Sequence, residues 1–247
     1  MTIVRCNDIR KSFLTRHGTV KAVDGVSLSI EKGETYGLVG ESGSGKTTLG
    51  KIILGILKPD SGSLKVGTKA IQVIFQDPYN SLDPKMKVAD ILSEGLILQE
   101  SSLRRRSPKQ SKNIIKDTLD LIRLPQDALR KYPHQFSGGE RQRIAIGRAV
   151  ITNPQFIVCD EPVSSLDVTI ELQILKLLKD IQKKFDVTYL FISHDLRVIK
   201  FMCNRMAVMK DGRVMEEGGV NEIFSRPKKE YTRQLLSSIL SIYRRDL

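Results

Sequence analysis

The 247-residue sequence has no long hydrophobic run and only three cysteines. It contains no stretch of about 18 consecutive apolar residues, so we expect no membrane-spanning helix. Residues 1–6 lack the apolar stretch of a signal peptide. Cys6, Cys159 and Cys203 are scattered without a CxxC pair. This pattern predicts reduced thiols in a cytosolic protein rather than disulfides or metal ligands.

The sequence also lacks internal repeats and low-complexity tracts. Its length suits one large α/β domain or two small ones, and its 40% hydrophobic fraction can bury a core. The formal net charge is +12, with basic clusters at residues 104–116, 141–148, 228–229 and 244–245. These clusters are compatible with a solvated surface or with a face near anionic lipid headgroups. No aromatic residues are interleaved with them, so we do not expect nucleic-acid binding.

A glycine-rich segment matches the phosphate-loop pattern G-x-x-x-x-G-K-[ST] at every fixed position. It comprises Gly40, Glu41, Ser42, Gly43, Ser44, Gly45, Lys46 and Thr47. The apolar run 35–39 before it predicts a buried strand, and the run 48–55 after it has helical spacing. Glycines let such a loop close tightly, and free amides at the helix N-terminus then face an anion. A chance Gly/Ser loop is the alternative, but it does not account for the matching flanks.

The chemistry of this pattern assigns roles to three side chains. We expect Lys46 to reach the β- and γ-phosphates of a nucleotide and Thr47 to offer its hydroxyl to Mg²⁺. Thr48 would lie on the α-phosphate side.

An acidic pair follows a second apolar run, residues 156–159. Such a run is typical of a central parallel strand that is buried on both faces. At its end, Asp160 is expected to hold Mg²⁺ through water, and Glu161 to polarise or orient an attacking water. Taken alone, the pair could instead cap the next helix.

A second glycine turn, Phe136-Ser137-Gly138-Gly139-Glu140, precedes a helical pattern at residues 141–149. With the phosphate loop upstream, it resembles the signature motif of ABC transporters, and the resemblance covers nearly the whole chain. The family arrangement implies that Ser137, Gly138, Gly139 and Glu140 face the γ-phosphate bound by a partner subunit. Glu140 stands where the family more often has Gln, which places a carboxylate near that anion site.

The resemblance extends to four isolated positions. Gln76 corresponds to the Q-loop glutamine, which would sense Mg²⁺ and attacking water. Asp167 belongs to a D-loop-like segment at the dimer interface, and His194 matches the switch histidine that contacts the γ-phosphate. Phe13 is the candidate adenine-stacking aromatic. Each is weak alone: a histidine after a strand is more often structural, and Phe13 could be an ordinary strand residue.

The fold implied is an α/β phosphate-loop ATPase cassette, with a RecA-like core, an antiparallel β subdomain and an inserted helical subdomain. We expect one domain over residues 1–247: a core at 1–76 and 136–220, helices at 77–135 and a tail at 221–247. The patterns predict helices at 88–96, 114–122 and 171–185. They also predict glycine turns at Asp24-Gly25, Lys32-Gly33, Ser61-Gly62 and Asp211-Gly212.

Two segments resemble one importer group within the family. Residues 76–84 look like the Q-loop of importers for oligopeptides, dipeptides and nickel. Residues 227–236 resemble the Pro-x-x-x-Tyr-Thr-x-x-Leu stretch of the same group, with Glu230 where Pro is usual. The short tail without a cysteine cluster is seen among nickel and metal-chelate importers, but short peptide-importer subunits also exist. Both cargoes stay open.

The resemblance implies an ATPase at the cytoplasmic face of the inner membrane, with ATP and Mg²⁺ as cofactors. Its partners would be a second ATPase subunit, preferably a different chain, two transmembrane permease subunits and, indirectly, an external substrate-binding protein. ATP would bind on one subunit, and the signature of the other would close over it. Two alternatives are a soluble ABC ATPase acting on nucleic acid or ribosomes, and a phosphate-loop kinase. The kinase would need neither the 137–139 turn nor the Gln76 and His194 pair.

Overall fold

The computed structural model describes residues 1–16, 18–100 and 107–243. The chain forms two compact units. Unit 1 comprises residues 1–69, 158–161 and 187–247, and unit 2 comprises residues 70–157 and 162–186. Strand β6 (Phe156–Asp160) begins in unit 2 and ends in unit 1.

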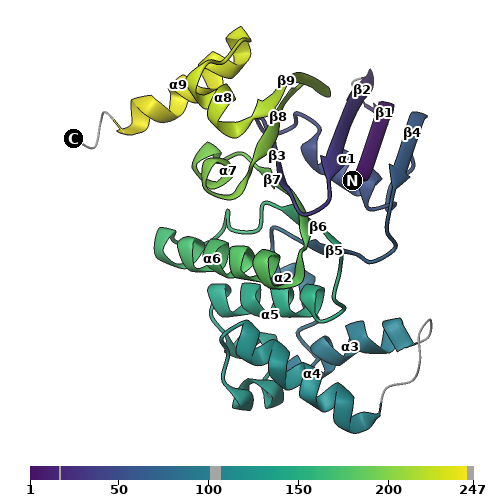
Figure 1. The fold of residues 1–247 in the computed structure, drawn as a ribbon, viewed down its shortest axis with the longest axis vertical. Helices are drawn as coiled ribbons and strands as arrows, with labels where there is room; N and C mark the ends of the chain where they lie inside the picture. Colours follow the sequence, from purple (N-terminus) through teal and green to yellow (C-terminus); the bar gives the residue numbers. More distant parts are fainter. Residues whose placement is uncertain (17, 101–106, 244–247) are drawn as a thin grey trace. The chain divides into compact units, whose positions relative to one another are not determined.

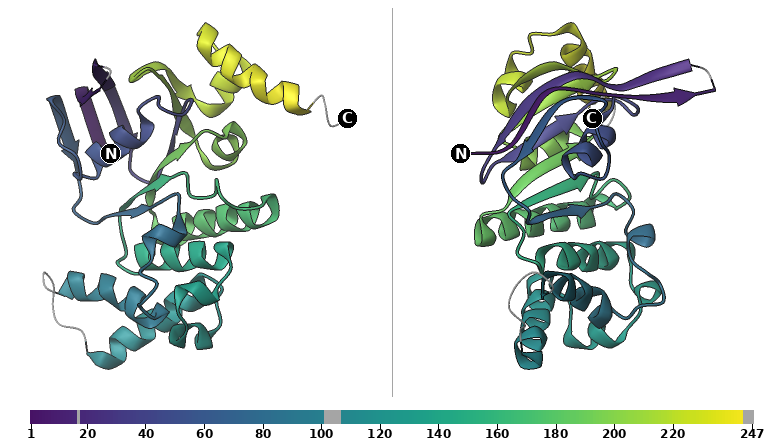
Figure 2. Two further views of the ribbon diagram at one scale, coloured as in Figure 1. Left: turned by 180° about the vertical axis from the view of Figure 1, so that it is seen from behind. Right: turned by 90° about the vertical axis from the view of Figure 1, so that its right-hand side faces the viewer.

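Unit 1 contains an antiparallel sheet of order β2-β1-β4. Its strands are β1 (Thr2–Thr15), β2 (Gly18–Glu31) and β4 (Ser61–Val66), which lie side by side in Figure 1. The β1–β2 hairpin extends beyond the shorter β4 (Figure 2). The predicted antiparallel β subdomain is therefore confirmed.

A second sheet contains β3, the strand that precedes the phosphate loop, together with other strands of unit 1. β3 (Thr35–Val39) pairs in parallel with β7 (Thr188–Ser193) and with β8 (Arg205–Lys210), and β9 (Arg213–Gly219) runs antiparallel to β8. Every residue of β3 and β7 is buried, as expected for parallel strands covered on both faces. The helices of unit 1 are α1 (Lys46–Ile53), α7 (Leu196–Met202), α8 (Val220–Ser225) and α9 (Glu230–Tyr243).

Unit 2 is mainly helical. It contains β5 (Ile71–Ile74), α2 (Pro78–Ser81), α3 (Val88–Glu100), α4 (Pro108–Leu121), α5 (Gly138–Val150), α6 (Val168–Phe185) and the 3₁₀ helices Gln126–Arg130 and Pro133–Gln135. Helix α5 packs against α2, α3, α4 and α6, and α5 and α6 lie side by side in Figure 1. A Cβ at Gly147 of α5 would come within 2.9 Å of Ile122, so a glycine here permits close helix packing.

Most predicted elements are present, and three details differ. The turn expected at Asp24-Gly25 is wrong: β2 continues through it, because Gly25, with φ +77°, is an extra residue opposite the Ile9–Arg10 step of β1. This arrangement is a β-bulge, for which glycine in a left-handed conformation is well suited. The turn expected at Ser61-Gly62 is also wrong, since both residues belong to β4.

The third difference concerns α6. The helical pattern of the sequence places Leu172 near the same face as Leu175, Leu178 and Ile181. The last three are buried, but Leu172 is 43% exposed. The turns at Lys32-Gly33 and Asp211-Gly212 are confirmed. Of the basic clusters, residues 104–106 and 244–245 lie outside the described residues. Within the described part of the chain, no helix combines the length and apolarity needed to cross a membrane.

Candidate active site

The phosphate loop joins β3 to α1 in unit 1, and neighbouring backbone lies very close to two of its glycines. A Cβ at Gly40 would lie 2.2 Å from the carbonyl oxygen of Met209, and a Cβ at Gly45 would lie 2.1 Å from that of Ala22. Both glycines have positive φ angles, 153° and 99°. Gly43 also has a positive φ, but a Cβ there would meet nothing within 4 Å. Neighbouring backbone therefore leaves no room for a side chain at Gly40 or Gly45, whereas the space beside Gly43 is open.

Lys46 is buried inside this loop. Its side-chain nitrogen donates hydrogen bonds to the carbonyl oxygens of Gly40 and Glu41, both at 2.8 Å, and to the Ser44 hydroxyl at 3.2 Å. The residue is only 5% exposed. Burial lowers the pKa of Lys46, and the neighbouring carboxylates of Glu161 and Asp160 partly oppose this effect. A bound anion would stabilise the charged form in the same way, so the loop fits a phosphate ligand.

Thr47 and Asp160 bring two oxygen ligands together. The Thr47 hydroxyl donates to Oδ1 of Asp160 at 3.0 Å. Burial raises the pKa of Asp160, and the hydrogen bond from Thr47 works against this shift. A cation at this point would stabilise the ionised carboxylate, and hydroxyl and carboxylate oxygens are ligands that suit Mg²⁺. Thr48, beside Thr47, is half-buried.

Thr47 and Asp160 provide only two protein ligands, fewer than a metal site formed by protein alone would need. Among the described residues, no three His, Cys, Asp or Glu side chains form a group that could hold a metal ion. Mg²⁺ commonly uses one or two protein ligands together with substrate phosphates and water. The side chains present therefore fit Mg²⁺ as part of a nucleotide complex.

Glu161 and His194 form a pair at the ends of β6 and β7. Oε1 of Glu161 lies 3.0 Å from Nδ1 of His194. Glu161 has a φ of +50°, an uncommon conformation for a residue of its type, and its backbone N–H donates to the carbonyl of Ile192 at 3.0 Å. The glutamate side chain is 18% exposed and that of the histidine 58%. The pair therefore presents a mostly shielded carboxylate beside an accessible imidazole, an arrangement that can orient a water molecule.

Phe13 lies on β1, paired with Val20 of β2. It is 41% exposed, which is high for a large apolar side chain in a sheet. The nitrogen of Lys11 lies 5.8 Å from the ring centroid. The accessible ring is compatible with stacking against a planar ligand.

The signature segment lies in unit 2, at the N-terminus of α5. Ser137 caps the helix: its hydroxyl accepts from the Glu140 N–H at 3.3 Å. The Glu140 carboxylate in turn accepts from the Ser137 N–H at 2.9 Å and from its hydroxyl at 2.8 Å. This is a capping box, so the unusual glutamate has a structural role within its own helix.

The two glycines of this segment differ in their surroundings. A Cβ at Gly139 would lie 2.5 Å from Cγ2 of Ile170 on α6, so glycine permits the packing of α5 on α6. A Cβ at Gly138 would meet only Leu166, at 3.7 Å. Packing within unit 2 therefore explains Gly139 but leaves Gly138 without a comparable reason.

The other predicted residues of unit 2 are surface positions. Gln76 is exposed and follows β5. Asp167 is exposed and caps α6, where its Oδ1 accepts from the Ile170 N–H at 3.0 Å. Unit 1 thus brings Lys46, Thr47, Asp160, Glu161 and His194 to one site, whereas Gln76, the signature segment and Asp167 belong to unit 2.

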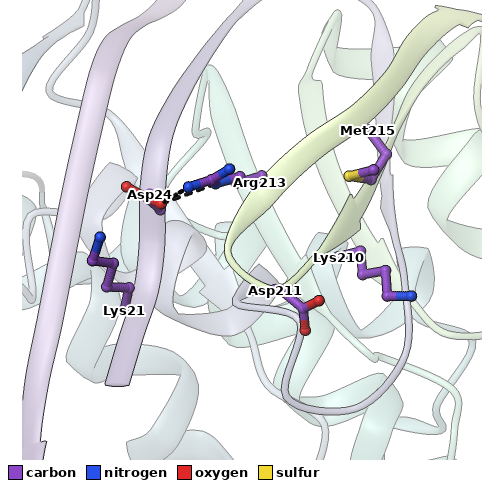
Figure 3. Close-up of a pocket in the computed structure, with 6 residues that line it drawn as sticks. All are labelled: Lys21, Asp24, Lys210, Asp211, Arg213 and Met215. Carbon is purple, nitrogen blue, oxygen red and sulfur yellow. Dashed lines mark hydrogen bonds and ion pairs between the residues drawn. The ribbon is translucent and has the colours of Figure 1, made fainter. Parts of the chain in front are cut away.

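Sequence reasoning missed the elements that back the phosphate loop. The turn between β8 and β9 donates a hydrogen bond from the Gly212 N–H to the Ser44 carbonyl at 3.1 Å, and the Gly212 carbonyl accepts from the Asp24 N–H at 2.8 Å. Figure 3 shows Arg213, just after this turn, reaching Asp24 of β2. The Asp-Gly turn was visible in the sequence, but nothing there indicated that it would contact residues about 170 and 190 positions away.

Comparisons with known proteins show the family to which this chain is similar. A model of the ABC transporter family matches residues 23–164. A putative peptide import ATP-binding protein of Brucella ovis is 43% identical, with 94% of this chain and 77% of that protein covered. Oligopeptide transport ATP-binding proteins of Lactococcus lactis (45% identical; 95% and 77% covered) and Bacillus subtilis (40%; 96% and 82%) are also similar.

Solved structures give the same result for the fold. The cbiO1 protein of Clostridium perfringens, described as part of the ABC transporter complex cbiONQ, has a TM-score of 0.79 and 26% identity, with 100% of this chain and 99% of that chain covered. A dimeric ATP-binding cassette in a post-hydrolysis state, bound to ADP and phosphate, has a TM-score of 0.77 and 27% identity, with 88% and 98% covered.

Proposed function

This chain belongs to the ABC transporter family as an ATP-binding, ATP-hydrolysing importer subunit, and we propose that it drives peptide uptake through a separate permease. The observation that carries the ATPase assignment is the site of unit 1, where a buried lysine, a Thr–Asp pair and a Glu–His pair converge. The relatives named above are peptide or oligopeptide transport proteins, which favours the peptide alternative over nickel or metal complexes.

In the proposed site, the loop amides and Lys46 hold the β- and γ-phosphates, and Phe13 stacks on the adenine. The loop residues that line the nucleotide are Gly40, Glu41, Ser42, Gly43, Ser44, Gly45, Lys46, Thr47 and Thr48. Glu161 orients and deprotonates the attacking water, and His194 holds the Glu161 carboxylate and faces the γ-phosphate.

Mg²⁺, when bound, neutralises charge on the phosphates. Thr47 and Asp160 of unit 1 would hold it, together with Gln76 of unit 2. Asp160 is suited to this role because its burial disfavours the uncompensated carboxylate.

The signature segment and Asp167 serve the partner's nucleotide in this proposal. Ser137, Gly138, Gly139 and Glu140 lie at a helix N-terminus, where backbone amides and the helix dipole attract anions. We propose a heterodimer with a second ATPase chain, whose closure over ATP performs the mechanical work.

The further partners are two transmembrane permease subunits and, indirectly, an external substrate-binding protein. The boundary between the helical subdomain (residues 77–135) and Gln76 would receive the permease, and this contact would hold the chain at the cytoplasmic face of the membrane. No nucleic-acid partner is part of the proposal.

The test is purification of a tagged Glu161→Gln variant from gently solubilised membranes with ATP and Mg²⁺, followed by mass spectrometry. Because the variant should bind ATP without hydrolysing it, the closed complex accumulates. Recovery of two permease chains and a second ATPase would support the proposal. Recovery with ribosomes or DNA-binding proteins, and without a permease, would favour the soluble ABC ATPase alternative.

A further inference from the structure

The segment 227–236, which resembles a stretch of the importer group, has no part in the proposed reaction, yet it reaches the phosphate loop. It forms the start of α9 in unit 1. Tyr231 of this helix is only 8% exposed, and its hydroxyl accepts a long hydrogen bond from the Glu41 N–H at 3.5 Å. The C-terminal part of the chain therefore touches the loop that holds the nucleotide.

A residue of the second sheet contacts the Tyr231 ring. The nitrogen of Lys210, the last residue of β8, lies 4.5 Å from the ring centroid, in cation–π range. The turn that follows Lys210 contains Gly212, whose N–H bonds the Ser44 carbonyl. One hairpin thus supports both the loop and the tyrosine that contacts it.

The start of α9 is anchored to β9. The buried carboxylate of Glu216 accepts the backbone N–H groups of Lys228 at 2.8 Å and Lys229 at 3.1 Å. Arg233 donates to the carbonyls of Pro227 and Lys228, both at 3.2 Å. These bonds fix the first turn of the helix, and with it the position of Tyr231.

Glu41 also bonds Lys46, the lysine of the phosphate loop. The Glu41 carbonyl accepts from Lys46, and the Glu41 N–H donates to Tyr231. Two contacts therefore hold this one residue of the loop, one to the phosphate-binding ammonium group and one to α9.

We propose that Tyr231 is a positioning residue for the phosphate loop: by holding Glu41, it keeps Lys46 placed for the nucleotide phosphates, and the anchorage of α9 to Glu216 sets nucleotide affinity. This inference rests on the proposed nucleotide site. Tyr231 acts through the loop and does not itself contact the reacting atoms.

The test is Tyr231→Phe in the full chain, which removes the hydroxyl and keeps the ring against Lys210. Because the variant loses one hydrogen bond to a neutral amide, we expect the Kd and KM for Mg²⁺-ATP to increase by about threefold. We expect kcat to change by less than about twofold, because Glu161 and His194 are untouched. Ser237→Ala, which removes an exposed hydroxyl of α9 that donates only to the Gln234 carbonyl of the same helix, is the control and should leave both constants unchanged.

A second variant tests the anchorage. Glu216→Gln keeps the size of the side chain but provides one carbonyl oxygen where two carboxylate oxygens each accept a backbone N–H. We expect Kd for Mg²⁺-ATP to rise by about threefold, even though Tyr231 is intact.

Two results would contradict the inference. If Tyr231→Phe and Glu216→Gln lower the melting temperature of the nucleotide-free protein while Kd and KM stay at the wild-type values, the segment is structural only. If the KM is unchanged and kcat falls, Tyr231 acts on the chemical step instead. Failure of the unmodified chain to bind Mg²⁺-ATP would refute the proposed function itself, so the two failures can be told apart.

Discussion

The phosphate loop of unit 1 and the signature segment of unit 2 are both glycine-containing turns at a helix N-terminus, but they are held in different ways. Backbone from β2 and β8 lies against Gly40 and Gly45 of the phosphate loop, and Lys46 is buried there. In the signature segment, Ser137 is exposed and the space beside Gly138 is open. The first site is enclosed by its own unit, whereas the second faces outward.

The two segments also differ in how their charge is balanced. Lys46 is a buried cation whose pKa is lowered by burial, which favours an anion beside it. The Ser137 N–H and hydroxyl, at the start of α5, already donate to the Glu140 carboxylate. A phosphate approaching Ser137 would have to share or displace that carboxylate. The comparison sets a buried cation in unit 1 against an exposed helix N-terminus in unit 2 that already carries a carboxylate.

The largest effect should come from Lys46→Ala. Removing the ammonium takes away at least two charged hydrogen bonds to phosphate, so we expect ATP affinity to fall on the order of 100-fold. The measurement is equilibrium binding of a fluorescent ATP analogue. Lys58→Ala, which removes an exposed lysine beyond α1, is the control. Wild-type affinity in Lys46→Ala would show that the enclosed loop is not the nucleotide site.

Glu161→Gln should separate binding from hydrolysis. The amide fits beside His194 but cannot accept a proton, so we expect ATP binding to persist and turnover to fall by at least about 100-fold. Phosphate release in single-turnover assays measures this, with Glu94→Gln as a surface control in unit 2. Near-normal turnover would remove Glu161 from the mechanism.

The two signature glycines should respond differently to alanine. Gly139→Ala forces a Cβ against Ile170, and we expect a loss of about 2 kcal/mol in the free energy of unfolding. The melting temperature should fall by roughly 4–8 °C.

Gly138→Ala is the matched partner of this experiment. Its Cβ meets no close neighbour, so the melting temperature should stay within about 2 °C of wild type. ATP-dependent dimerisation, measured by light scattering in a Glu161→Gln background, should weaken. Unchanged dimerisation would mean that no partner approaches this face closely.

The smallest effect is expected from Glu140→Gln. Glutamine can also complete a capping box, so stability should change by less than about 0.5 kcal/mol. Removing the negative charge should favour phosphate at Ser137 and increase ATP-dependent dimerisation by roughly twofold to fivefold, since surface and helix-end charges contribute about 0.3–1 kcal/mol. Glu140→Ala, which also removes the cap, separates the two roles by losing stability.

Much of the fold could be predicted because its signals are local. The apolar runs before Gly40 and Asp160 predicted buried strands, and both are buried. Turn chemistry was less reliable. Asp24-Gly25 has the composition of a turn, but pairing with β1 keeps β2 extended through it as a bulge, so a long-range register overrides the local preference.

The features of the candidate site likewise fall into those that the sequence predicts and those that depend on tertiary packing. By itself the sequence determined the phosphate loop, the acidic pair after β6 and the second glycine turn, because each depends on residues that are adjacent in the chain. Only the tertiary structure decided that Glu161 meets His194 and that Gly139 packs on α6. It alone placed Tyr231 against Glu41, because a contact across about 190 residues depends on how the sheets and α9 pack, and no local pattern encodes that packing.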